Sequence, residues 1–192
     1  RKRRGDRLLV HQSLWGIIFK TKGSFGKTKM DIVHEMNLDL LNSIKDGFKY
    51  NEKEYEQIVK NSSEILMSKT KGESFYGMFF PCERLSKIFI YKGKLVDNEA
   101  ESDFTYYFDK DKRLVLTKRQ FNEQDLSLIF YYYHESYIDV IWFSVSDNEV
   151  ETVGRIEVPE GVLTNWLVSD IFEGNKIIGY HEYYFTIKKG WV

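Results

Sequence analysis

Aromatic residues are concentrated in one part of this chain, and their density constrains the fold more than any other feature. Between Phe104 and Phe143, twelve of forty residues are Phe, Tyr or Trp. Aromatic and β-branched side chains fit the pleated, half-buried surface of a sheet. These residues therefore predict a β-sheet rather than an active site.

From Ser74 onward the apolar residues alternate with a period of two, which is typical of strands. Short polar segments separate most of these runs, as in hairpin turns. Residues 163–172 also fit a short helix. Successive hairpins without helices between them predict an antiparallel meander. The expected strands lie near residues 74–80, 86–92, 103–109, 113–120, 126–134, 137–146, 150–158, 163–172 and 177–187.

Two helices are expected before the sheet, because the apolar residues there recur at helical spacing. Asp31 is the expected N-cap of the first helix and Gly47 its end, while Asn51 caps the second and Gly72 suits its end. The predicted fold class is α+β, with two N-terminal helices packed on a curved antiparallel β-meander. The expected apolar faces comprise Ile32, Val33, Met36, Leu40, Leu41 and Ile44 in the first helix, and Tyr55, Ile58, Val59, Ile65 and Leu66 in the second.

The net charge of −1 hides an uneven distribution along the chain. Residues 1–30 contain nine Lys and Arg and one Asp, a net charge of +8. Residues 31–192 contain nineteen Lys and Arg against twenty-eight Asp and Glu, a net charge of −9. We expect residues 30–192 to form a single α+β domain. Residues 1–29 are interpreted as a basic tail, the end of a longer protein, or non-native sequence upstream of a start at Met30.

The cysteine content and the lengths of the apolar runs indicate the cellular compartment of the protein. The chain has no run of the 18 or more apolar residues that span a membrane, and Arg1–Arg4 is not followed by a signal-peptide pattern. Cys82 is the single cysteine, so neither an internal disulfide nor a cysteine-based zinc site is expected. These features favour a cytoplasmic protein without a membrane partner.

One segment has part of a phosphate-binding motif. Gly26-Lys27-Thr28 is the tripeptide that ends a P-loop, and a hydrophobic run precedes it. However, the motif requires a glycine where this chain has Thr21, and its fold requires parallel strands. A nucleotide-binding protein or enzyme using this loop is therefore the alternative hypothesis.

The other candidates for chemistry are isolated residues. Cys82 would need a neighbouring histidine to act as a nucleophile. His134-Glu135 and His181-Glu182 lack the spacing of a His-Glu-x-x-His site, and the acidic clusters lack the glycine and distal glutamate of a calcium loop. We expect no catalytic residue, metal site or cofactor, and the balance favours a non-enzymatic protein. Nucleic acid is not an expected partner, because the acidic body would repel its phosphates.

An acidic body rich in Tyr and Trp suits a protein-binding module. These side chains anchor interfaces, and negative potential steers a basic partner into place. A small-ligand protein with an internal cavity stays open as a third possibility. The expected partner-binding residues are aromatic and acidic side chains exposed at the hairpins: Tyr107, Asp109, Asp111, Tyr132, Glu135 and Asp147. Alternation places neighbours on opposite sides of the sheet without showing which side is buried, so half of these residues could instead be core.

Two segments carry a resemblance to a known class of proteins. Phe104–Leu114 (FTYYFDKDKRL) and His181–Phe185 (HEYYF) resemble small uncharacterised bacterial proteins of the immunity type, which are partners of secreted polymorphic toxins. The resemblance extends over residues 31–192 in general layout. It implies a non-enzymatic bacterial protein that neutralises a basic toxin domain by occlusion of its active surface. It implies no catalytic residues.

Overall fold

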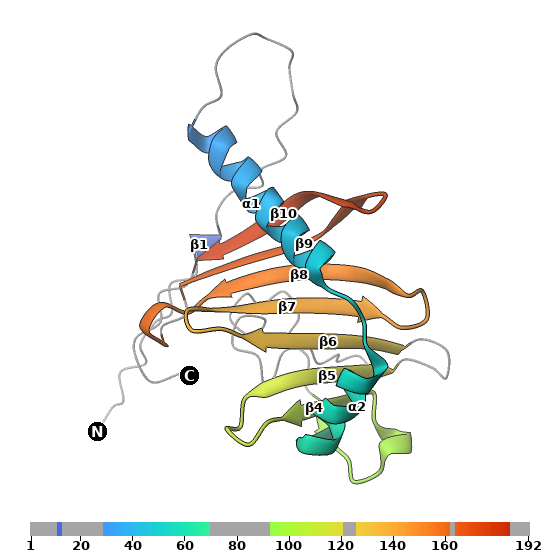
Figure 1. Ribbon diagram of the computed structural model, residues 1–192. Coiled ribbons are helices and arrows are strands. Elements are labelled where there is room, and N and C mark those ends of the chain that lie inside the picture. Colours follow the sequence, from blue (N-terminus) through green and yellow to red (C-terminus); the bar gives the residue numbers. More distant parts are fainter. Residues whose placement is uncertain (1–10, 13–28, 70–92, 121–125, 162–163, 185–192) are drawn as a thin grey trace, which may run out of the picture.

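The computed structural model describes residues 11–12, 29–69, 93–120, 126–161 and 164–184. Helices α1 (Lys29–Gly47) and α2 (Glu52–Asn61) accompany a ten-stranded antiparallel sheet (Figure 1). The strands are β1 (His11–Gln12), β2 (Ser63–Lys69), β3 (Gly93–Leu95), β4 (Phe104–Phe108), β5 (Leu114–Gln120), β6 (Leu126–Tyr133), β7 (Tyr137–Ser144), β8 (Glu149–Glu157), β9 (Asn165–Glu173) and β10 (Lys176–Tyr184). Two short 3-10 helices are η1 (Glu99–Glu101) and η2 (Pro159–Gly161).

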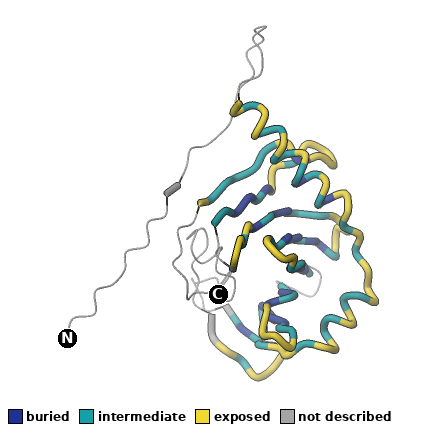
Figure 2. The backbone as a smooth tube through the Cα atoms, turned by 60° about the vertical axis from the view of Figure 1, so that its left-hand side comes forward, coloured by how far each residue is buried: buried dark blue, intermediate teal, exposed yellow. Residues whose placement is uncertain are grey.

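The order of the strands confirms the antiparallel meander and the α+β class. From β4 to β10 each strand pairs with the next one along the chain, while β2 and β3 extend the sheet beyond β4 and β1 extends it beyond β10. Residues 165–173 form a strand between two partners rather than a helix. The sheet is curved (Figure 2). The strands expected near 74–80 and 86–92 lie outside the described residues.

Both faces of the central strand β6 are buried. Leu128 and Phe130 face the helices, whereas Ile129 and Tyr131 belong to a second apolar cluster on the opposite face. All four side chains are buried. A strand covered on both faces carries a continuous apolar run, and the sequence of β6 has this pattern. The aromatic density therefore supplies a core on each side of the sheet.

Helix α2 begins where the sequence predicts and ends earlier. The Oδ1 atom of Asn51 accepts a hydrogen bond from the Lys53 N–H at 3.1 Å, which satisfies an otherwise unpaired donor of the first turn. The predicted extension toward Gly72 was wrong, because Ile65 and Leu66 lie in β2. Residues 63–67 of β2 pair with β4. The hydrogen bonds of this pairing determine the local structure, although the two side chains have helical spacing.

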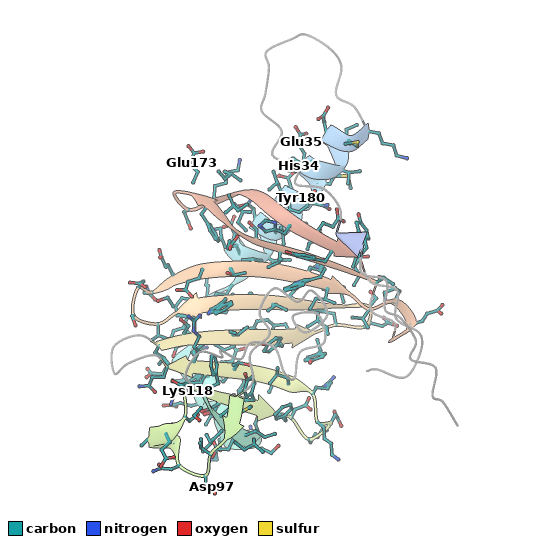
Figure 3. All side chains as sticks on the ribbon, turned by 180° about the vertical axis from the view of Figure 1, so that it is seen from behind. His34, Glu35, Asp97, Lys118, Glu173 and Tyr180 are labelled. Carbon is teal, nitrogen blue, oxygen red and sulfur yellow. The ribbon has the colours of Figure 1, made fainter. Side chains whose placement is uncertain are left out.

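Helix α1 lies against the last three strands. Leu41 is fully buried in a cluster with Val153, Leu167 and Ile177. Nearer its N-terminus, the His34 ring stacks on Tyr180 with their centroids 5.1 Å apart (Figure 3). These contacts fix the direction of α1 across β8, β9 and β10, and so they also place its C-terminal end.

The predicted apolar face of α1 was wrong in its N-terminal half. The helix begins at Lys29, so Asp31 lies inside its first turn rather than at the N-cap. Ile32, Val33 and Met36 are exposed, with 47%, 47% and 64% of their surface accessible. This part of α1 extends past the edge of β10 (Figure 1). The helical spacing was therefore correct, but among the described residues these three side chains are not buried against the sheet.

Asn42 joins α1 to the edge of the sheet, and its loss should loosen both. Its Nδ2 atom donates to the Ile177 carbonyl at 3.0 Å, and its Oδ1 atom accepts from the Ile177 N–H at 2.9 Å. Asn42→Ala leaves these part-buried backbone groups unpaired, which should lower the free energy of unfolding by about 1–3 kcal/mol. Urea denaturation would measure the change. An exposed control, Ser43→Ala, should stay within about 0.5 kcal/mol of the parent. Equal values for both variants would contradict the role given to Asn42.

Candidate functional site

A cleft of about 710 Å³ lies at the end of the sheet that carries the β7–β8 and β9–β10 turns. The C-terminal end of α1 contributes Lys45 and Asp46, and the segment between the helices contributes Phe48 and Tyr50. Phe143 of β7 and residues of both turns complete the lining. Three segments that are distant in sequence, residues 45–50, 143–151 and 172–175, thus meet here, because every second turn of the meander lies at the same end of the sheet.

Aromatic rings form the floor of the cleft. The Tyr50 and Phe143 rings are stacked, with centroids 4.9 Å apart and planes 15° apart. The Phe48 ring lies against Phe143 at 5.5 Å in a tilted arrangement. Phe143 is buried, while Phe48 and Tyr50 are half-buried. The floor is therefore packed on the core through Phe143, while Phe48 and Tyr50 remain partly exposed to the cleft.

A buried cation stands at one wall. The Lys45 side chain is only 5% exposed, and its Nζ atom donates to Asp46 Oδ1 at 2.7 Å and to Asn175 Oδ1 at 3.0 Å. The Asp46 side chain itself is 68% exposed. A buried ammonium needs such a partner, because an uncompensated charge in this position is costly. Lys45 therefore ties α1 to the β9–β10 turn and has its charge matched by Asp46.

Carboxylates contribute to the electrostatics around the cleft. Desolvation by burial raises the pKa of Tyr50, and the carboxylates of Glu52 and Glu56 raise it further. Desolvation also raises the pKa of Glu151; Arg119 and a hydrogen bond from Ser127 lower it, while Asp147 and Glu149 add to the increase. Neighbouring carboxylates thus act on titratable groups that line the cleft.

A second polar cluster lies on the same face of the sheet, toward the opposite end. Arg155 donates from Nε and Nη2 to the two carboxylate oxygens of Asp139, at 2.7 and 2.9 Å. Its guanidinium lies 3.8 Å from the centroid of the Tyr137 ring. The His134 Nε2 atom is 3.5 Å from Asp139 Oδ2. Because the Asp139 carboxylate is buried, this arrangement serves chiefly to compensate its charge.

The two tyrosines expected to contact a partner lie beneath α2. Tyr107 is 4% exposed and belongs to the core, so its expected exposure was wrong. Tyr132 is half-buried, and its pKa is raised first by desolvation and then by the nearby Glu54. Both side chains are on the helix-facing side of the sheet. They bury the apolar side of α2 rather than extend toward a partner.

The four acidic candidates lie in turns at two different ends of the sheet. Asp109 and Asp111 occupy the β4–β5 turn and bind Arg113, with Asp109 Oδ2 2.7 Å from its Nη2. Glu135 is exposed in the β6–β7 turn, at the same end. Asp147 lies in the β7–β8 turn at the opposite end, where it accepts a hydrogen bond from Ser144. The six candidates do not form one surface, and only Asp147 lies near the cleft.

The sequence reasoning missed most of the residues in the cleft. Phe48 and Tyr50 sit in the short segment between the two helices, where two aromatic rings beside charged residues were the available signal. Lys45 and Asp46 looked like an ordinary helix end. No local pattern links these residues to Phe143, because the contact depends on the tertiary arrangement.

Other candidates from the sequence receive no structural support here. Gly26-Lys27-Thr28 and Cys82 lie outside the described residues. Within the described residues, no group of three or more His, Cys, Asp or Glu is placed to hold a metal ion. No helix in the part of the chain that the structure describes is long and apolar enough to cross a membrane. The cleft is therefore the candidate site with the clearest geometry.

Comparison with known proteins adds no relative. No protein-family model, no curated protein and no solved structure matches this chain. The function must therefore be inferred from the residues of the cleft and from the charge around it.

Proposed function

We propose that this protein is a non-enzymatic binding module for a basic protein, and that the cleft is the centre of its interface. The proposal includes the cytoplasmic immunity role suggested by the resemblance, in which the module neutralises a toxin by covering its active surface. The observation that carries the proposal is an aromatic floor ringed by carboxylates. Aromatic anchors supply binding energy, and complementary charge selects the partner.

The charge of the body supports a basic partner. Residues 31–192 contain 28 Asp and Glu against 19 Lys and Arg, a net charge of −9. Around the cleft, Asp46, Glu149 and Glu173 are exposed carboxylates at the ends of three different elements. Negative potential of this kind accelerates association with a basic protein and excludes acidic ones.

Reversing the charge at the cleft should weaken binding of the partner far more than reversing it elsewhere. The test variant is Glu149→Lys/Glu173→Lys in the full chain, which leaves the Lys45–Asp46 pair in place. The matched control is Glu135→Lys/Glu157→Lys, which changes the net charge equally at the opposite end of the sheet. We expect the parent and the control to capture the same basic protein from a lysate of the source organism. The cleft variant should bind that protein about 100-fold more weakly, since each like-charge contact costs on the order of 1.4 kcal/mol or more.

The design has a clear negative result. Capture of the same proteins by all three forms, or failure of the folded parent to retain any basic protein, would contradict the proposed function. Circular dichroism of each variant establishes that it is folded. The interaction should also weaken as the salt concentration rises from 50 to 500 mM, values chosen on the order of those that screen surface charges.

A further inference from the structure

We propose that the cleft receives an arginine side chain of the partner, stacked against the aromatic floor. This inference rests on the proposed function and adds the chemical group that the cleft recognises. Tyr50 is half-buried and stacks on Phe143, so the space of the cleft borders an aromatic surface. Guanidinium groups stack on such rings and pair with carboxylates in the same plane.

The protein itself places arginines in this kind of surrounding. Arg155 lies over the Tyr137 ring and binds the Asp139 carboxylate. In the β4–β5 turn, the Arg113 guanidinium is 5.0 Å from the Tyr133 ring centroid and binds Asp109. In both places an aromatic ring and a carboxylate hold a guanidinium between them.

The cleft offers the same two components without an arginine of its own. Tyr50 and Phe143 provide the rings, and Asp46 and Glu149 provide carboxylates. Of the twelve described residues that line the cleft, none is arginine. A volume of about 710 Å³ is ample for one arginine side chain and accompanying water. The missing guanidinium is therefore the group that would complete the arrangement.

Lys45 limits which cations fit. Its ammonium is held by Asp46 and Asn175, so Glu149 is the lining carboxylate left for a second cation. A guanidinium spreads its charge over a plane and is less strongly hydrated than an ammonium. A guanidinium therefore loses less hydration free energy than an ammonium when it enters the cleft. It also gains more binding free energy from stacking on the rings. This favours arginine over lysine.

The test uses small probes with the full chain. The probes are acetyl-arginine amide, acetyl-lysine amide and acetyl-citrulline amide, which has the shape of arginine without its charge. NMR titration should show the arginine probe binding about fivefold more tightly than the lysine probe, with shifts at Tyr50 and Glu149. Equal binding of citrulline and arginine, or no binding of arginine, would overturn the inference.

Two variants of one residue separate the aromatic contact from a change in folding. Tyr50→Phe keeps the ring and should preserve the affinity for the arginine probe. Tyr50→Leu removes the ring but keeps an apolar side chain, and it should weaken that affinity about fivefold. The same pair is then measured with the captured partner. If Tyr50→Leu binds the partner as tightly as the parent while Glu149→Lys/Glu173→Lys does not, the arginine inference fails and the proposed function stands.

Discussion

Replacing Asp139 with alanine should lower the free energy of unfolding by about 3 kcal/mol, because it strands the guanidinium of Arg155. Asp139 is 8% exposed and accepts both hydrogen bonds of a two-point contact with Arg155. The Arg155 side chain is 18% exposed and lies over the Tyr137 ring, so it cannot move fully into water without losing that contact. Urea denaturation should show a lower midpoint with an unchanged slope.

The double variant Asp139→Ala/Arg155→Met identifies the cause of the loss. Removing both charges leaves no stranded ion, and replacement of such pairs by apolar side chains is often neutral or stabilising. We therefore expect the double variant to recover most of the stability lost by Asp139→Ala. If the double variant is as unstable as the single one, then the lost packing of Asp139 matters more than the charge of Arg155.

The meander was predictable because its signals are local. The apolar run of β6 and the polar turn at 134–136 specify a hairpin without reference to distant residues. The same holds for each later pair of strands. A hairpin needs only neighbouring residues to define it, so a chain built of successive hairpins can be read from its sequence.

The errors occurred where distant residues decide the outcome. Ile65 and Leu66 continue the helical spacing of α2. They nevertheless lie in a strand, where they pair with Tyr106 and Thr105 of β4. Met36 has the spacing of a buried helical residue, yet its side chain is 64% exposed. In both cases the residues have helical spacing in the sequence. Whether such a residue is buried, and which element it packs against, depends on the tertiary fold.

The candidate site was less predictable than the fold for the same reason. The sequence indicated acidic hairpin turns, and Asp147 does lie in a turn near the cleft. However, turns of a meander alternate between the two ends of the sheet. Asp111 and Glu135 therefore lie at the end opposite to Asp147. The aromatic floor depends on Tyr50 meeting Phe143, two residues that no local pattern connects.

Phe143 joins the stability of the fold to the shape of the cleft. Its ring is 4% exposed, pairs across the sheet with Leu128 and Val150, and supports both Phe48 and Tyr50. A change here should therefore affect folding and recognition together. Exposed residues of the cleft such as Glu149 should affect recognition alone.

Phe143→Ala should lower the free energy of unfolding by about 3–5 kcal/mol, the cost of a large cavity in a core. For a chain of this size the midpoint of thermal unfolding should fall by roughly 10 °C. Phe143→Leu fills most of the space and should cost less than half as much, but it removes the ring beneath Tyr50. At a temperature where Phe143→Leu is fully folded, it should still bind acetyl-arginine amide more weakly than the parent. Unchanged affinity in Phe143→Leu would show that Tyr50 is held in place without the Phe143 ring, and that stacking between the two does not shape the cleft.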